Sequence, residues 1–158
     1  MRSPLVAGAA GTALAAVLMT APSAGGTIVV QHGIGGVQLQ MTKASVRSTL
    51  GAPRRVVRGR NDFGRYTLFV YPRVTVSFQS GPRVTGLRTS SRLERTAAGI
   101  GVGSTEAQVR SRVARVRCRT DAGSRHCFVG RFLPGHVVTD FQLRGGRVSR
   151  VDVGVVLD

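Results

Sequence analysis

Residues 36–50 read GVQLQMTKASVRSTL, and residues 99–113 read GIGVGSTEAQVRSRV. Six of the fifteen aligned positions are identical at a constant offset of 63 residues, and three more exchange one aliphatic residue for another. The same offset continues without a gap as far as Gln79 and Gln142. Because chance similarity in a biased composition rarely keeps one offset over such a length, the pattern predicts an internal duplication.

Each copy begins with the pattern of a short helix. Thr42 and Thr105 are typical N-cap residues, whose hydroxyl groups accept hydrogen bonds from free amides of the first turn. An apolar face begins four residues after each cap, at Val46 and Val109. Helices of about ten residues are too short to be stable alone, so a sheet must support them.

The rest of each copy has the pattern of strands. Val74, Val76 and Phe78 alternate with polar residues, which predicts a strand with one buried face. The offset places Thr139 and Phe141 on the equivalent face of the second copy. We therefore expect an α+β fold of two tandem repeats. Each repeat is a short helix followed by about four antiparallel strands, and together they form a sheet with the helices on one face and the other face open.

This arrangement sets the expected organisation of the chain. Residues 27–89 form the first repeat, residues 90–98 a linker and residues 99–158 the second repeat. Together, residues 27–158 make one compact two-repeat domain.

The element G-[VI]-x-[LV]-x-x-T-x-A-x-V-R, followed by hairpin strands, resembles the tandem-repeat family of the β-lactamase inhibitory protein. It also resembles the single-repeat SmpA/OmlA (BamE-like) module of small outer-membrane assembly lipoproteins. The resemblance covers residues 36–156 and implies a non-enzymatic interaction module. The motif consists of packing and capping residues, and this chain has no Trp, two Tyr and one Cys pair. The resemblance therefore implies a fold, and no inhibitor contact residue is carried over.

Residues 1–26 have the layout of a secretory signal peptide. Arg2 precedes an uncharged Ala/Leu/Val/Gly run over residues 5–19, and small residues follow over 21–26. Cleavage after Ser23 and cleavage after Gly25 both fit. The alternative is an uncleaved anchor, but the apolar run is shorter than the ~20 residues needed to span a bilayer. We expect a secreted, extracellular protein, either free or associated with the cell envelope, without stable membrane insertion once the signal is removed.

Export determines how the two cysteines are interpreted. Cys118 and Cys127 bracket a turn-forming segment, and in an oxidising compartment they predict a disulfide across two neighbouring strands. The alternative is a reactive thiol beside His126, which requires one cysteine to be free.

Composition gives a formal net charge of +16, from 23 basic and seven acidic residues, and every basic residue except Lys43 is Arg. A hydrophobic content of 42% excludes a disordered basic tail. Two arginine clusters fall at corresponding places in the two copies and could join into one patch for an anionic partner. The candidate binding residues are Arg54, Arg55, Arg58, Arg60, Arg115, Arg117 and Arg119. The alternative explanation is a GC-rich genome, which favours Arg over Lys.

Patterns for catalysis and metal binding are weak. The chain contains no motif of a zinc protease, serine hydrolase or nucleotide-binding loop. The stretch 99–104 is glycine-rich, but without a following Lys it is interpreted as a helix-entry loop. Asp140 and Asp152 could meet across the last hairpin, where salt-bridged surface acids are expected rather than a catalytic pair. Three scattered histidines do not predict a metal site. Taken together, these weak patterns lead us to expect no catalytic residue, cofactor or metal.

These patterns lead to three functional hypotheses. The first is a secreted non-enzymatic binding module that engages a protein or an anionic envelope partner through the open sheet face. The second is an extracellular binder of polyanions, either wall polymer or DNA, through the arginine clusters. Few aromatic residues lie near those clusters, so nucleic acid is the less favoured ligand. The third, held as the least favoured, is a small hydrolase.

Overall fold

A computed structural model describes residues 27–157, so the predicted signal peptide lies outside the described residues. Two short helices and eleven strands follow one another along this part of the chain. The elements are β1 (Ile28–Val29), β2 (Gly33–Ile34), β3 (Val37–Gln38), α1 (Lys43–Leu50), β4 (Arg55–Asn61), β5 (Gly64–Val70), β6 (Thr75–Gln79), β7 (Gly86–Thr89), α2 (Glu106–Arg112), β8 (Arg117–Asp121), β9 (Ser124–Gly130), β10 (Val137–Arg144) and β11 (Arg147–Val155).

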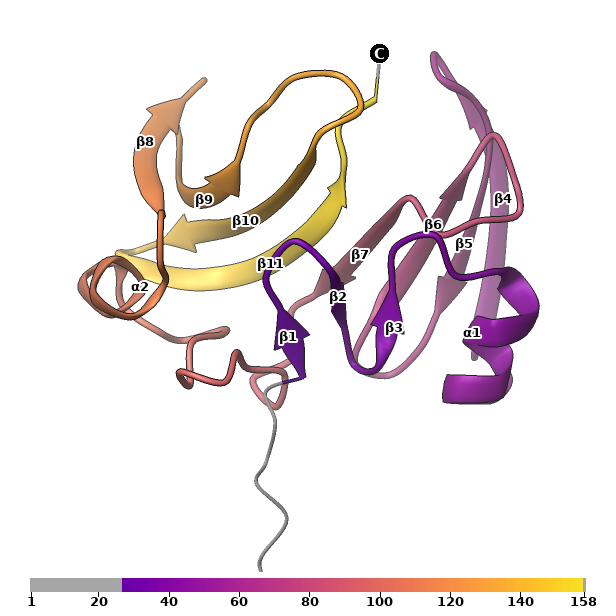
Figure 1. The fold of residues 1–158 in the computed structure, drawn as a ribbon, viewed down its shortest axis with the longest axis horizontal. Coiled ribbons are helices and arrows are strands. Elements are labelled where there is room, and N and C mark those ends of the chain that lie inside the picture. The colour runs from indigo at the N-terminus through magenta and orange to yellow at the C-terminus, as the bar shows by residue number, and fades with distance from the viewer. Residues whose placement is uncertain (1–26, 158) are drawn as a thin grey trace, which may run out of the picture.

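Two antiparallel sheets form the molecule. The larger has eight strands in the order β4-β5-β6-β7-β11-β10-β9-β8, and the smaller consists of β1, β2 and β3. The large sheet is strongly curved, and the small sheet and both helices lie on one of its sides (Figure 1). The other side carries no helix or further sheet within residues 27–157. We call it the open face.

The expected α+β fold class is wrong. The described chain is mostly β, with an eight-stranded antiparallel sheet and a three-stranded sheet rather than two helix-plus-strand repeats. The helices span only eight and seven residues, and each buries a single residue, Val46 or Val109. Helices this small cannot form a layer of their own, so strands dominate the packing. The domain and linker boundaries at residues 89 and 98 stay predictions.

The small sheet was missed because it has almost no strand pattern. Its strands are two residues long and are separated by tight turns. Gln31 and Gln40 adopt positive φ of 61° and 68°, as do the glycines at 35 and 36. Left-handed residues are typical of turns and rare within strands, which makes this segment look like loop in a sequence.

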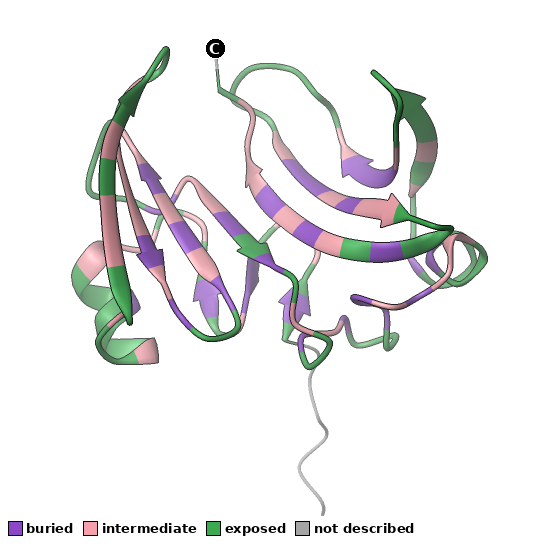
Figure 2. Ribbon diagram, turned by 180° about the vertical axis from the view of Figure 1, so that it is seen from behind, coloured by how far each residue is buried: buried purple, intermediate pink, exposed green. Residues whose placement is uncertain are grey.

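A single hydrophobic core lies between the two sheets and beneath the helices. Phe69, Phe78 and Phe141 are its largest fully buried side chains. The Phe69 and Phe78 rings meet edge to face at 4.8 Å between centroids. The predicted alternation on β6 is confirmed, because Val76 and Phe78 are buried while their neighbours are partly exposed (Figure 2).

Both predicted N-caps are confirmed. The Thr42 hydroxyl accepts a hydrogen bond from the Ser45 amide, and the Thr105 hydroxyl accepts one from the Gln108 amide. The second helix has an additional tie to the sheet. Glu106, its first residue, accepts hydrogen bonds from Arg125 on β9, with Nε to Oε2 at 3.0 Å and Nη2 to Oε1 at 2.5 Å.

The predicted disulfide between Cys118 and Cys127 is present. The two residues are directly opposite on β8 and β9, with their Cα atoms 3.9 Å apart. Closing a loop of this size contributes about 2.7 kcal/mol in the chain-entropy model. The bond fixes the outermost strand β8, which has only one neighbouring strand. Among residues 27–157, no helix is long and apolar enough to cross a membrane.

The hydrogen bonds between Glu106 of α2 and Arg125 of β9 predict a specific dependence of stability on pH. The hydrogen bond from Arg125 is the main cause that lowers the pKa of Glu106 from 4.5 to about 2. The pKa of Glu106 is lower in the folded state than in the unfolded state. The ionised carboxylate therefore stabilises the fold above pH 4.5, and this stabilisation is lost as pH falls towards 2. We expect wild type to exceed Glu106→Gln in free energy of unfolding above pH 5, and the difference to vanish near pH 2.

Urea denaturation at a series of pH values measures this difference. Asp62→Asn is the matched control, because Asp62 is an exposed acid with no ion pair among the described residues. It should leave the pH profile almost unchanged. A Glu106→Gln difference that stays constant from pH 6 to pH 2 would contradict the assignment.

Candidate functional site

The open face is hollowed above the middle strands of the large sheet. Ser77 on β6, Gly86 on β7 and Gly154 on β11 are aligned side by side across these strands. Because all three residues are small, they form the floor of a groove of about 590 Å³. We call this the open-face groove.

Larger side chains form the two walls of the open-face groove. On one side stand Tyr66 and Leu68 of β5. Tyr66 packs over Gly59 of the neighbouring strand so closely that a Cβ atom there would lie 2.5 Å from the ring. Two residues further along β7 and β11 from the floor glycines, Arg88 Nε lies 2.5 Å from Asp152 Oδ1. The groove therefore has an aromatic and apolar wall on β5 and a charged wall formed by Arg88 and Asp152.

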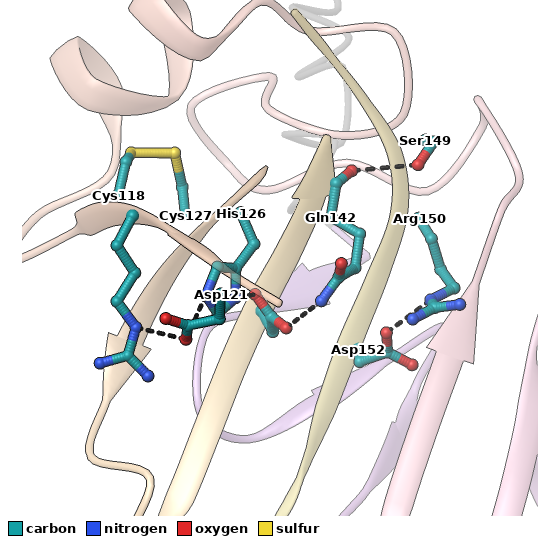
Figure 3. Close-up of polar contacts among 10 residues, drawn as sticks. Cys118, Asp121, His126, Cys127, Gln142, Ser149, Arg150 and Asp152 are labelled. Carbon is teal, nitrogen blue, oxygen red and sulfur yellow. Dashed lines mark hydrogen bonds and ion pairs between the residues drawn. A yellow bond between two sulfur atoms is a disulfide. The ribbon is translucent and has the colours of Figure 1, made fainter. Parts of the chain in front are cut away.

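Polar side chains continue from this charged wall towards β8. Arg88 is opposite Asp152, and Asp152 is opposite Asp140 in the strand register. Asp152 also accepts a hydrogen bond from Arg150 Nε at 2.7 Å. Asp140 and Asp152 therefore meet across the last hairpin as expected. Asp152 is a salt-bridged acid, and Figure 3 shows its contact with Arg150.

His126 lies at the centre of a second group on this face. Its Nδ1 is 2.8 Å from Asp140 Oδ1 and its Nε2 is 3.1 Å from Asp121 Oδ2. Gln142 donates to the other Asp140 oxygen, and Arg119 Nε lies 2.6 Å from Asp121 Oδ2. We call these five residues the His126 network; they connect β8, β9 and β10 (Figure 3).

Burial limits the chemistry available to this network. The His126 side chain is only 7% exposed, and both ring nitrogens face carboxylate oxygens. Burial raises the pKa of Asp140, while the hydrogen bond from His126 opposes that shift. Since no ring nitrogen is free to take a proton from a substrate, the arrangement is suited to holding three strands together rather than to acid–base catalysis.

Aromatic rings and guanidinium groups cover the outer end of the open face. The Arg117 and Arg119 guanidinium carbons lie 5.1 and 4.8 Å from the centre of the Phe128 ring. Arg119 also lies 5.3 Å from the Phe132 ring, which is 41% exposed. Stacking of this kind holds the arginine side chains flat against the sheet.

The structure does not place the two predicted arginine clusters on adjacent strands. Arg55, Arg58 and Arg60 lie on β4, directly after Arg54, whereas Arg117 and Arg119 lie on β8. These two strands are the opposite edges of the large sheet. Only Arg60 among the seven lines the open-face groove.

Arg115 does not share a strand with the other two candidate arginines of its cluster. Arg115 adopts a positive φ of 59° in the turn before β8, so it does not continue the alternation of Arg117 and Arg119. A left-handed residue changes the direction of the chain, and the period of two applies only within a strand.

One group of possible metal ligands lies within the described part of the chain, at Glu106, Cys118 and Cys127. The two sulfur atoms are bonded to each other, and the carboxylate accepts hydrogen bonds from Arg110 and Arg125. These atoms are therefore engaged in other interactions rather than available to a cation.

Sequence reasoning missed both the open-face groove and the His126 network. The groove has a weak signal, because Gly86 and Gly154 interrupt runs of strand-forming residues, and a glycine inside a strand often marks a close approach. The sequence spacing gives no signal for the His126 network, because His126 and Asp140 come together only through the register of β9 and β10.

The His126 network predicts a contrast between two of its carboxylates. The Asp140 side chain is 13% exposed and Asp121 is 50% exposed. Replacing His126 by Leu leaves a buried carboxylate without its main partner, and we expect a loss of roughly 3 kcal/mol in free energy of unfolding. Asp121→Asn removes only an exposed contact and should cost less than about 1 kcal/mol.

Chemical denaturation of both variants measures this contrast. The double variant His126→Leu/Asp140→Leu removes both buried partners, so it should be less destabilised than His126→Leu alone. Equal losses for His126→Leu and Asp121→Asn would show that the two carboxylates are equivalent and would contradict the account.

Comparison with known proteins gives a likeness of fold. No protein-family model matches the chain, and no curated protein matches it in sequence. The crystal structure of YjgB, a DUF4309 family protein from Bacillus subtilis, is similar with a TM-score of 0.52 and 17% identity. The match covers 82% of this chain and 88% of that one.

An extracellular protein containing an SCP domain, from Bacillus anthracis, is similar at 11% identity with a TM-score of 0.48. That match covers 74% of this chain and 44% of the other. YjgB is neither a β-lactamase inhibitory protein nor an SmpA/OmlA-type module, so the family resemblance has only loose support at the level of fold. This chain shares its overall fold with the DUF4309 protein YjgB.

Proposed function

We propose that the protein is a secreted, non-enzymatic binding module that holds a segment of a partner protein in the open-face groove. The observation that carries the proposal is the groove itself, a hollow of about 590 Å³ over strands that are hydrogen-bonded to one another along its floor. Ligand sites of this size commonly combine apolar walls with a few polar groups.

The walls suggest which kind of segment fits. Tyr66, Leu68 and Leu157 offer apolar contact, and Leu157 is 37% exposed at the end of the groove. Arg88 lines the same groove, with its side chain 56% exposed and its ion pair to Asp152 made through Nε. Its terminal nitrogens are therefore available to bind an acceptor. An extended segment with an apolar side chain next to a carboxylate complements both walls.

Export is part of the proposal. A leader over residues 1–26 would direct the chain to an oxidising compartment, and the Cys118–Cys127 disulfide is of a kind that persists there. The closed His126 network supports a binding role in place of catalysis, because its ring nitrogens already have partners.

A substitution that fills the open-face groove tests this function. A Cβ at Gly86 would meet Ser77 Cβ and Val153 O at 3.8 Å, an ordinary contact, so Gly86→Val should fold and reduce the groove. The partner is captured from the native cell envelope with wild-type protein, purified, and titrated with each variant. We expect Gly86→Val to weaken binding by at least about tenfold, the loss typical of a filled central pocket.

Gly81→Val is the control, because Gly81 lies in the β6–β7 turn and does not line the groove. It should leave the dissociation constant within about twofold. Thermal melts confirm that both variants fold. Equal binding by Gly86→Val and Gly81→Val, or no saturable binding of any envelope protein, would reject the groove as the binding site.

A second candidate function is binding of an anionic polymer at the two sheet edges. All seven predicted arginines are exposed, and only Arg119 among them is paired with a carboxylate within residues 27–157. Such unpaired charge would attract wall polymer or DNA by releasing counterions. This candidate predicts that binding to a phosphodiester polymer weakens steeply between about 50 and about 500 mM salt.

Variants of each edge separate the two candidates. Arg54→Gln/Arg58→Gln and Arg117→Gln/Arg119→Gln should each weaken polymer binding and flatten its salt dependence. Polymer affinity that does not change over that salt range would exclude the electrostatic candidate without affecting the groove.

A further inference from the structure

A second pocket lies away from the open-face groove and is lined by four arginines. It has a volume of about 290 Å³ and shares no lining residue with the groove. Arg92 and Arg95 come from the segment between β7 and α2, Arg112 is the last residue of α2, and Arg147 is the first residue of β11. We call it the four-arginine pocket.

Two of these arginines are held in place by the backbone. Arg95 donates from Nη1 to the Gly99 carbonyl at 2.9 Å and from Nη2 to the Val102 carbonyl at 3.4 Å. Arg147 donates from Nη1 to the Gly103 carbonyl at 3.0 Å. Because neutral carbonyls hold these groups, their positive charge is fixed without being neutralised.

The other two arginines have no such contacts. Arg92 and Arg112 are exposed and form no ion pair or side-chain hydrogen bond within residues 27–157. None of the lining residues is acidic. The acids nearest in sequence to the lining residues are Glu94, which is buried with Oε1 3.9 Å from Arg73 Nη1, and Glu106, which is held by Arg110 and Arg125. Four like charges therefore line one pocket with no acidic side chain among its lining residues, and an anion between them would relieve their repulsion.

Glycines keep the loop side of the pocket open. Gly99 and Gly103 adopt positive φ of 77° and 94°, and a Cβ atom at either would meet nothing within 4 Å. Gln108 also lines the pocket. Its Oε1 accepts a hydrogen bond from the Thr105 amide, which directs the side-chain amide nitrogen to act as a further donor.

We propose that the four-arginine pocket binds a phosphate group that carries two negative charges. Guanidinium groups bind phosphate through pairs of parallel hydrogen bonds, and the tetrahedral oxygens of phosphate can meet donors from several directions. A planar carboxylate has one charge and two oxygens, so it satisfies fewer of these donors. The site is independent of the open-face groove, and either could exist without the other.

The start of α1 supplies a matched control. Thr42, its N-cap, is bridged to Arg83, just as Thr105 is bridged to Arg147 at α2. Arg83 donates from Nη1 to the Gln40 carbonyl at 3.0 Å, the same kind of contact that Arg147 makes. Arg83 does not line the four-arginine pocket. Arg83→Gln thus removes one equivalent charge from outside the pocket.

Isothermal titration with inorganic phosphate and with glycerol 3-phosphate, in chloride buffer of constant ionic strength, tests the proposal. The test variants are Arg92→Gln and Arg112→Gln, whose side chains make no hydrogen bond or ion pair within residues 27–157. We expect saturable one-to-one binding to wild type, at least about tenfold weaker binding to each test variant, and less than about twofold change for Arg83→Gln. Arg112→Lys keeps the charge without the paired donors and should still weaken binding.

The two probes distinguish the source of the phosphate. Binding of inorganic phosphate alone would indicate a free ion, and comparable binding of the ester would indicate a phosphate at the end of a larger molecule; both outcomes support the site. No saturable binding of either probe, or equal weakening by Arg83→Gln and the two test variants, would overturn it. Since Gly86→Val leaves this pocket intact, the groove and the phosphate site succeed or fail separately.

Discussion

The pairing of β7 with β11 is the interaction on which the rest of the structure depends. Its register runs from Thr89 opposite Val151 to Gly86 opposite Gly154. The four paired positions join β4–β7 to β8–β11, which would otherwise be two separate four-stranded sheets. Leu87 and Val153 are opposite each other in this pair and are both almost fully buried, so the join also makes the core continuous.

The same pairing creates the open-face groove. Gly86 and Gly154 leave the centre of the open face without side chains, while their buried neighbours Leu87 and Val153 keep the core filled beneath. A glycine within a strand normally weakens it. Here two glycines are opposite each other at the join, and ladder hydrogen bonds on both sides hold them. A hollow can thus form over a backbone that stays rigid, which is favourable for a binding site.

Local features of this fold were predictable from the sequence, while long-range pairings were not. The caps at Thr42 and Thr105 and the Cys118–Cys127 bond depend on residues close together in the chain, and each was predicted correctly. The α+β fold class was wrong because helix length was overestimated and because the segment 27–41 has turn-like composition. Strand order could not be predicted either, because the alternation of apolar and polar residues shows which face of a strand is buried but not which other strand pairs with it.

The charge of the chain shows the same limit. Composition shows that the protein is strongly basic. It does not show that Asp152 forms ion pairs with two arginines, or that β4 and β8 are the opposite edges of the large sheet. Nor does it show that Arg92, Arg95, Arg112 and Arg147, which are distributed over 56 residues of sequence, line one pocket. Those groupings arise only once the strands are paired, so the functional meaning of the charge follows from the topology.

Native-state hydrogen exchange tests the central claim that β7 and β11 make one rigid platform. The experiment compares the backbone amides of β7 and β11, at the join, with the backbone amides of β5 and β10, which lie on either side of it. If the sheet is one cooperative unit, all four strands should exchange with the same free energy of opening, equal to that of global unfolding. Earlier opening at β7 and β11, with the two flanking groups exchanging independently, would contradict it.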